Sequence, residues 1–213
     1  QAEVTVRAGT GNDYVDIDGV AFGSETVFHG GPGNDVIDIC ETSGVWSLGG
    51  RLTVNGDSDT DALTIHDSSA GVGVTYTVDA AQVADAFGNE VFYSGLESLA
   101  LRAGAHGDTV NIHDVAWGTG ATVYGGGGED HFLVCGESNI FALSGSLTVD
   151  GEGGDDELFV YDQSYAGSTN YTITASQVAD GYGNEVAYSG LADLTLRTGQ
   201  GTCGVTLSSF AAG

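Results

Sequence analysis

The amino-acid sequence predicts an all-β fold, a parallel β-helix (β-solenoid) of about nine coils built from a 95-residue repeat. Three observations lead to this prediction. The chain repeats itself, apolar residues alternate after each of a series of glycine-rich turns, and glycine makes up 36 of the 213 residues while proline occurs once. This composition is typical of a chain with many tight turns rather than of a proline-rich linker.

The internal repeat organises the whole chain. When the sequence is shifted by 95 residues against itself it aligns without a gap, so that Leu52-Thr53-Val54 falls on Leu147-Thr148-Val149 and Cys40 on Cys135. Repeats of this kind bury their apolar faces only by stacking on their neighbours. We therefore expect a single solenoid domain over residues 1–213, with repeats at 1–95 and 96–190 and a partial third repeat at 191–213.

A smaller unit recurs within each repeat: an apolar pair, a glycine-rich turn, an acidic residue, and then alternating apolar positions. The alternation has the period of a β-strand, and the 18 to 29 residues between successive acids are the length of one solenoid coil. Asp85 and Asp180 are alternatives for the fourth acid of each repeat. The acids that mark the coils are Asp13, Asp35, Asp61, Glu90, Asp108, Asp130, Asp156 and Glu185, and Cys203 takes this position in the partial repeat.

The charge of the chain excludes several kinds of partner. It has 30 Asp and Glu but only 4 Lys and Arg, which gives a formal net charge of -26. Such a field repels phosphate backbones and anionic bilayers, so we expect no nucleic-acid partner. No run approaches the 18 or so apolar residues of a membrane span, so we expect no membrane insertion. Cations, above all metal ions, become the favoured partners.

The turns have the composition of calcium sites. Residues 30–38 and 125–133 both read G-G-x-G-x-D-x-U-x, where glycines turn backbone carbonyls inward and the aspartate supplies the hard oxygen that Ca²⁺ prefers. The turns before Asp61 and Asp156 replace glycines with further acids. The candidate calcium ligands are Asn12, Asp13, Asn34, Asp35, Asp57, Asp59, Asp61, Asp108, Glu129, Asp130, Glu152, Asp155 and Asp156.

Stacking gives a reason for an ion at these turns, which could otherwise be ordinary turns without one. We expect eight turns to recur along one edge of the solenoid, with neighbouring carboxylates about 5 Å apart. At that separation two like charges repel by roughly 0.8 kcal/mol in water, and by more when they are partly buried. The sequence therefore predicts Ca²⁺ as the counter-ion.

Beyond these motifs, the chain resembles the RTX-like, acidic calcium-binding β-solenoid repeats of large secreted bacterial surface proteins. The resemblance extends over the whole chain and rests on the two nonapeptides and on phrases such as Leu147-Thr148-Val149-Asp150-Gly151 and Tyr93-Ser94-Gly95-Leu96-Glu97-Ser98-Leu99. It implies calcium at the turns and an extracellular or cell-surface location. The nonapeptides are not in tandem here, so the regular ion array of an RTX β-roll is not implied.

The cysteines and histidines suggest a second, weaker metal site. Alternation places Cys40 beside His66, and Cys135 beside His113, on the outer surface of adjacent coils, where a soft metal could bind with help from Asp18. Two ligands per repeat fall short of four, so a ladder of mixed surface residues is the favoured interpretation. No disulfide within the chain is expected, because the three cysteines lie several coils apart, while a bridge between chains stays open.

The sequence does not favour catalysis. Solenoid enzymes that act on polysaccharides need a base or a charge-neutralising cation in a groove, and the four arginines here are scattered. Arg7, Arg102 and Arg197 share one phase of the 95-residue repeat, which favours a structural role as surface ion pairs or as a lid over the turn acids. We therefore expect a protein that is not an enzyme.

The ends of the stack suggest a partner. Solenoids need atypical capping coils, and neither end of this sequence shows one, so we expect either end-to-end stacking of copies or flanking solenoid repeats in a longer chain. The expected function is a calcium-stabilised extracellular structural protein, a subunit of a filament or surface layer. The alternatives are an adhesin stalk or secretion-type binding module within a larger exported protein and, more distantly, the calcium-binding module of a polysaccharide-modifying enzyme.

Overall fold

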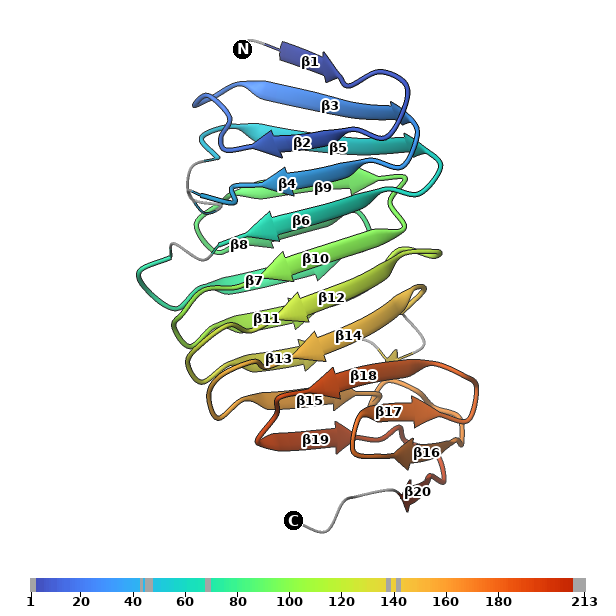
Figure 1. Ribbon diagram of the computed structural model, residues 1–213. Coiled ribbons are helices and arrows are strands. Elements are labelled where there is room, and N and C mark those ends of the chain that lie inside the picture. Colours follow the sequence, from blue (N-terminus) through green and yellow to red (C-terminus); the bar gives the residue numbers. More distant parts are fainter. Residues whose placement is uncertain are drawn as a thin grey trace.

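Two ten-stranded, mainly parallel β-sheets face each other in the computed structural model of the chain, which describes residues 3–42, 44, 48–67, 70–136, 139–140 and 143–208 (Figure 1). The prediction of an all-β fold is confirmed. The first and last residues of the predicted 1–213 domain lie outside the described residues.

The strands of each sheet are given in spatial order. The first sheet contains β1 (Glu3–Arg7), β3 (Glu25–Pro32), β5 (Arg51–Ser58), β9 (Glu90–Ser94), β8 (Gln82–Asp85), β7 (Thr75–Asp79), β11 (Thr109–Ile112), β13 (His131–Val134), β15 (Glu157–Tyr161) and β19 (Asp193–Arg197). The second contains β2 (Tyr14–Ile17), β4 (Val36–Ile39), β6 (Ala62–His66), β10 (Ser98–Arg102), β12 (Gly120–Tyr124), β14 (Ser146–Asp150), β18 (Glu185–Ser189), β17 (Gln177–Asp180), β16 (Asn170–Ile173) and β20 (Gly204–Leu207).

The chain crosses to the opposite sheet after almost every strand, so each strand pairs in parallel with strands from the preceding and following crossings. In the first sheet Phe28 stands in register between Val6 and Val54, and in the second Ile37 stands between Val15 and Leu63. These side chains point between the sheets, where Phe28, Val54, Ile37 and Leu63 are buried. The predicted apolar columns therefore form the core.

Two segments depart from this pattern and change the predicted coils. β7, β8 and β9 form an antiparallel meander within the first sheet, and β16, β17 and β18 form the equivalent meander within the second. Glu90 and Glu185 begin the last strand of each meander, so the prediction that they mark a turn between sheets is wrong. Alternation counted from Glu90 predicts that Phe92 faces inward, but this phase is off by one residue: Val91 and Tyr93 are buried, and Phe92 faces outward.

Equivalent strands of the two repeats lie in opposite sheets. Every strand of the first repeat recurs 95 residues later, but the counterpart of β1 is β10, which lies in the other sheet. The reason is that each meander stays in one sheet, so that one repeat makes an odd number of visits to the sheets. The second repeat therefore starts half a turn around the stack from the first.

The half-turn gives the stack two different edges. We define edge I as the edge where the chain leaves the first sheet, at the right of Figure 1, and edge II as the edge where it returns. Edge I has the glycine-rich turns of the first repeat followed by longer loops of the second. Edge II has the longer loops of the first repeat followed by the glycine-rich turns of the second. The prediction that all these turns share one edge is wrong.

Two of the three repeated arginines stack on aromatic rings. The Arg102 guanidinium lies 4.1 Å from the centroid of the Tyr124 ring, and that of Arg197 lies 5.4 Å from the Tyr161 ring. Arg7 lies in β1, which has a neighbouring strand on one side only. At Arg102 and Arg197, these cation–π contacts stand in place of the predicted ion pairs or lid over the turn acids.

A buried tyrosine and aspartate pair ties one longer loop to the core in each repeat. The Tyr76 hydroxyl donates a hydrogen bond to the Asp67 carboxylate, and Tyr171 donates to Asp162 in the same way. All four residues are buried. Burial raises the pKa of the Asp162 carboxyl, so its charged form depends on the donors that it keeps.

We expect Tyr76→Phe to lower the free energy of unfolding by about 1–3 kcal/mol, because Asp67 loses a buried donor. Thermal or urea unfolding measures this change. Tyr161→Phe is the matched control, since the Tyr161 ring is half-buried beneath Arg197, and we expect its effect to stay within about 0.5 kcal/mol. Equal stability of the two variants would contradict a structural role for the buried pair.

Candidate metal centre

The turn aspartates stack into two ladders, one on each edge. Ladder I, on edge I, contains Asp13, Asp35 and Asp61. Ladder II, on edge II, contains Asp108, Asp130 and Asp156. In both ladders each aspartate comes directly before a strand, so strand pairing places the carboxylates one above another.

One hydrogen bond per step holds each ladder in register. In ladder I the Asp13 amide donates to Asp35 Oδ1 and the Asp35 amide donates to Asp61 Oδ1, both at 2.9 Å. In ladder II the Asp108 amide donates to Asp130 Oδ1 at 2.7 Å, and the Asp130 amide donates to Asp156 Oδ1 at 2.9 Å. Asp35, Asp61, Asp130 and Asp156 therefore each use one oxygen to accept a hydrogen bond from the backbone of the neighbouring turn.

The second oxygen of most ladder carboxylates is buried with nothing to bond. Within the described part of the chain, Oδ2 has no hydrogen-bond partner in Asp13, Asp35, Asp61, Asp130 and Asp156. Four of these side chains belong to residues that are at most 1% exposed, Asp13 being half-buried. A buried anionic oxygen without a partner is strongly unfavourable unless a proton or a cation neutralises it.

Asp108 differs because both of its oxygens are satisfied. Oδ1 accepts from the Val74 amide at 2.6 Å and Oδ2 accepts from the Gly104 amide at 3.0 Å. Asp108 therefore caps ladder II, and the unmet oxygens of that ladder belong to Asp130 and Asp156.

The pKa values of the ladder aspartates also indicate that the buried carboxylates lack a neutralising partner. Burial raises the pKa of the Asp130 carboxyl to about 7, with smaller contributions from the charges of Asp156 and Asp108. Burial also raises the pKa of Asp61, Asp108 and Asp156, against the lowering effect of the backbone amides that donate to them. Without a cation, the carboxyls of Asp61, Asp108, Asp130 and Asp156 hold their protons more tightly than an exposed aspartate does.

Glycines make room for the orphaned oxygens. A Cβ atom at Gly30 would lie 2.4 Å from Asp35 Oδ2, and one at Gly56 would lie 2.6 Å from Asp61 Oδ2. Gly125 and Gly151 have the same relation to Asp130 and Asp156, at 2.3 and 2.5 Å. No side chain fits at these four positions unless the carboxylate shifts, so glycine here serves the ladder.

The outer predicted ligands form a second, exposed row beside ladder I. Asn12 Oδ1 accepts from the Asn34 amide at 2.9 Å, Asn34 Oδ1 accepts from the Thr60 amide at 3.1 Å, and Asp59 Oδ2 accepts from the Gly33 amide at 3.1 Å. On edge II, Glu129 and Asp155 are exposed beside Asp130 and Asp156. The structure thus brings eleven of the thirteen predicted ligands to the two ladders and their borders.

Asp57 and Glu152 do not belong with the ladder carboxylates. Asp57 has a φ of 75° and pairs with His29, whose Nδ1 lies 3.1 Å from the Asp57 carboxylate. Glu152, its counterpart in the second repeat, is exposed and has a φ of 62°. Both acids have the left-handed backbone conformation that Gly31 and Gly126 have in other turns. At this position the side chains no longer alternate between the inside and the outside as they do in a strand.

Glu97 extends ladder I, although no turn motif marks it. Its Oε2 accepts from the Asp61 amide at 2.8 Å. Its counterpart is Ala192, so ladder II lacks this step. The available signal is Gly95-Leu96-Glu97, a short glycine turn after a meander, which sequence reasoning did not count as a turn between sheets.

The cysteines and histidines do not form a soft-metal site. Cys40 adjoins the paired Ile39 and Ile65, as predicted, but it is buried with a φ of 59°, which turns the thiol inward instead of outward. His66 Nε2 lies 3.4 Å from the Asp38 carboxylate. Cys135, the equivalent of Cys40, is likewise buried with a φ of 58°, and His113 Nδ1 lies 3.2 Å from the Asp79 carboxylate. All three cysteines are present as thiols.

The donor set is that of a hard cation. Orphaned carboxylate oxygens and glycine cradles fit Ca²⁺, while no three His, Cys, Asp or Glu side chains within the described ranges gather closely enough to bind a metal by themselves. An ion at the ladders would therefore need backbone carbonyls besides Asp35, Asp61, Asp130 and Asp156.

Comparisons with known proteins give no assignment. No family model, no curated protein and no solved structure matches the chain. No described segment forms a helix with the length and apolar character needed to cross a membrane.

We expect Gly56→Ala to lower the free energy of unfolding by about 1–3 kcal/mol, because its Cβ would lie 2.0 Å from the Gly95 carbonyl oxygen as well as against Asp61. Gly71→Ala is the control, since a Cβ there meets no atom within 4 Å, and its effect should stay within about 0.5 kcal/mol. Thermal unfolding of both variants measures the difference. A Gly56→Ala protein as stable as Gly71→Ala would show that the turn tolerates a side chain.

We expect the chain in a chelator to lose stability as the pH rises from about 4 to about 7. The Asp130 carboxyl has a pKa of about 7 in the folded chain but about 3.9 when unfolded, so the folded state binds more protons in this interval and the free energy of unfolding falls with pH. In saturating Ca²⁺ the ion replaces the proton, and stability should instead rise. Unfolding at about pH 5 and about pH 8, with EDTA or with millimolar Ca²⁺, measures both trends. Identical trends in the two media would contradict ion binding at the ladders.

Proposed function

We propose that this chain is a calcium-stabilised extracellular structural protein, a β-solenoid whose copies stack end to end into a filament or surface layer. The observation that carries the proposal is the set of five buried carboxylate oxygens without a partner, arranged in two ladders.

The solenoid interpretation rests on the path of the chain. Parallel pairing between strands of successive crossings, with the apolar side chains facing inward, is how a wound chain stacks its coils. The predicted count of nine coils included one at Glu90 and one at Glu185. Because both residues lie in meanders, the number of windings is smaller than the number of predicted turn acids.

Calcium binding explains why the ladders are anionic. Asp35 and Asp61 in ladder I, and Asp130 and Asp156 in ladder II, would each offer the otherwise unused Oδ2 to the ion, and the exposed acids at the borders would raise its local concentration. Ca²⁺ supplies the positive charge that the buried oxygens lack. Such a protein gains its full stability only where calcium is abundant, which supports an extracellular or cell-surface location.

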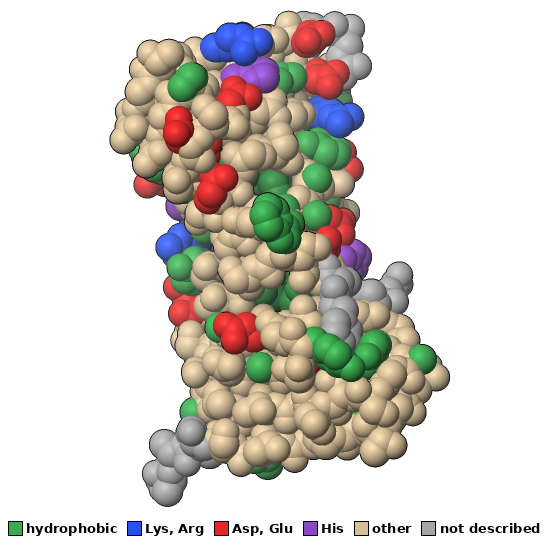
Figure 2. Space-filling view, turned by 90° about the vertical axis from the view of Figure 1, so that its right-hand side faces the viewer, with side chains coloured by type: hydrophobic (Ala, Val, Ile, Leu, Met, Phe, Trp, Pro, Cys, Tyr) green, Lys and Arg blue, Asp and Glu red, His purple; other side chains and the backbone are tan. Residues whose placement is uncertain are grey.

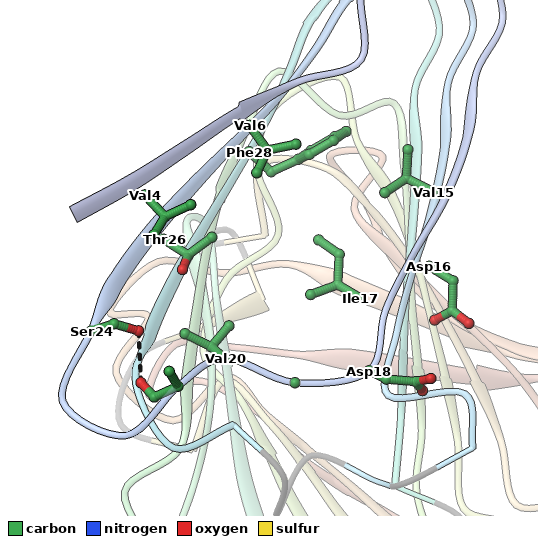
Figure 3. Close-up of a pocket in the computed structure, with 12 residues that line it drawn as sticks. Val4, Val6, Val15, Asp16, Ile17, Asp18, Val20, Ser24, Thr26 and Phe28 are labelled. Atoms are coloured by element: carbon green, nitrogen blue, oxygen red, sulfur yellow. Dashed lines mark hydrogen bonds between the residues drawn. The ribbon is translucent and has the colours of Figure 1, made fainter. Parts of the chain in front are cut away.

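The first end of the stack presents an open apolar face. β1 is exposed along its whole length, and a hollow of about 550 Å³ lies between the ends of the two sheets, lined by Val4, Val6, Val15, Ile17 and Phe28 among others (Figure 3). Val4 and Val6 are 47% and 43% exposed. An apolar face with an unpaired strand edge is suited to association with a further strand pair.

The other end presents the matching face. β20 is exposed along its length, with Val205 and Leu207 51% and 66% exposed. Two repeats separate these strands from the first pair, so Val205 and Leu207 are the counterparts of Val15 and Ile17. β19 and β20 lie in the first and second sheets, as β1 and β2 do, so a second copy can continue both sheets.

Ladder I gives this contact a polar register. The Asp13 carboxylate is the first in ladder I, and no amide among the described residues donates to it. Its Oδ2 is buried. Cys203 stands at the equivalent turn position on edge I at the opposite end, and among the described residues its amide donates no hydrogen bond. In an end-to-end stack the Cys203 amide would donate to Asp13, as the Asp13 amide donates to Asp35.

We expect the 213-residue chain to form fibres in millimolar calcium, visible by electron microscopy, and to remain dispersed in EDTA. Val6→Asp should abolish the fibres while leaving the calcium-dependent stability intact, because a charge at the open face opposes stacking. Val72→Asp is the control, as Val72 is 52% exposed in a loop between strands and should not affect assembly.

Stable monomers in calcium would contradict the filament. If calcium still stabilised such monomers, the ion site would stand and the chain would instead fit a stalk or secretion-type module of a larger exported protein. An unchanged melting curve in EDTA would contradict the calcium site itself.

A further inference from the structure

Edge I of the second repeat presents an exposed tryptophan on a rigid turn. Trp117 is 87% exposed between β11 and β12. The Thr119 amide donates to the Ala116 carbonyl at 3.0 Å, and Gly118 has the positive φ of 85° that the third residue of a type II turn requires. The Trp117 indole therefore projects into solvent, and a ligand can cover its apolar face.

A polar depression lies at the start of β14, the strand that pairs with β12. It has a volume of about 280 Å³, and the side chains of Ser144, Ser146, Asn184 and Glu185 line it. The Ser146 amide donates to the Thr119 carbonyl at 3.1 Å, so one residue that lines the depression is hydrogen-bonded to the last residue of the turn that carries Trp117. The walls offer hydroxyl, amide and carboxylate groups within one small concavity.

Two tyrosines border the depression on the side away from Trp117. Tyr182, two residues before Asn184, is 60% exposed and packs edge to face against Tyr165 with ring centroids 6.1 Å apart. The Asp180 carboxylate accepts from the amides of both Tyr182 and Asn184, at 2.8 and 3.0 Å. Hydrogen bonds therefore close this turn as well as the one that carries Trp117.

We propose that this strip of edge I, formed by Trp117, the depression and the Tyr165–Tyr182 pair, binds an uncharged or amino-bearing oligosaccharide. Aromatic faces stack on the C–H faces of sugar rings, and the hydroxyl, amide and carboxylate groups between them bond sugar hydroxyls. The net charge of -26 repels anionic glycans. This binding activity lies beyond the structural function proposed above and does not depend on filament formation.

The surrounding surface favours a sugar over a protein partner. Figure 2 faces edge I, and the lower part of this face is largely free of charged side chains while hydrophobic side chains stand out from it. A protein hot spot needs an aromatic anchor seated in a packed, apolar pocket. Here the rings stand outside, and the concavity between them is polar.

The first repeat provides an internal control on edge II. Its equivalent positions carry Phe22 in place of Trp117, Gly49 and Arg51 in place of the two serines, Ala70 in place of Tyr165 and Phe87 in place of Tyr182. Phe22 is 95% exposed, so exposure of an aromatic side chain is retained while the hydroxyls and the paired ring are lost. We expect only the second repeat to bind.

Calorimetric titration of the full chain in millimolar calcium tests the proposal. The probes are tetrasaccharides of three kinds: uncharged, made of glucose or N-acetylglucosamine; amino-bearing, made of glucosamine; and anionic, made of uronic acids. We expect saturable binding of an uncharged or amino-bearing probe, weakened at least tenfold by Trp117→Ala and by Tyr182→Ala. The matched controls Phe22→Ala and Phe87→Ala should change affinity less than twofold. Unfolding curves of all four variants check the fold.

Three results would overturn the proposal: no saturable binding of the uncharged and amino-bearing probes, binding of the uronic-acid probe alone, or equal losses in the second-repeat variants and their first-repeat controls. If Trp117→Ala loses both binding and the fold, then Tyr182→Ala and Ser144→Ala test the proposal in its place. Retained binding in both of these would also overturn it.

Discussion

The burial of carboxylates at the turns is the constraint on which most of the structure depends. Strand stacking alone does not require a particular residue at the end of each turn. Here Asp35, Asp61, Asp130 and Asp156 each accept a hydrogen bond from the backbone of the neighbouring turn, and this bond aligns the two turns. The bond leaves the other oxygen of Asp35, Asp61, Asp130 and Asp156 inside the molecule without a partner. The glycines opposite them, the raised pKa values and the acidic borders all follow from the need to fit and neutralise these oxygens.

The second organising feature is the meander. Because β7, β8 and β9 remain in one sheet, the second repeat is carried to the opposite side of the stack. Similar turns therefore come to lie on opposite edges, and each edge joins one half with a carboxylate ladder to one half with longer loops. A single 95-residue pattern thus produces two surfaces per edge, and small differences between the repeats give one of them the indole, hydroxyls and paired tyrosines that the other lacks.

The sequence pattern predicts much of the candidate site because turn and strand signals are local. Asp13, Asp35, Asp61, Asp108, Asp130 and Asp156 were identified from their position between a glycine turn and an alternating strand, and all six occupy the ladders. The prediction fails where the local signal is ambiguous. At Glu90 a turn acid and the first residue of a hairpin strand look alike, and an error of one residue exchanged the inner and outer faces around Phe92. Cys40 was placed outward because a left-handed residue at a strand end breaks the alternation without a glycine to mark it.

The amino-acid sequence by itself determined that the chain is all-β, that its strands recur every 95 residues, and that acids stand at the turns, since each of these depends on residues close together in the chain. Only the tertiary structure decided which edge each acid lies on, that one oxygen of Asp35, Asp61, Asp130 and Asp156 is satisfied while the other is not, and that Trp117, Ser144 and Asn184 share one surface. The physical reason is that these relations join residues from different windings of the chain. They depend on how many times it crosses between the sheets, and a pattern read along the sequence does not report that number.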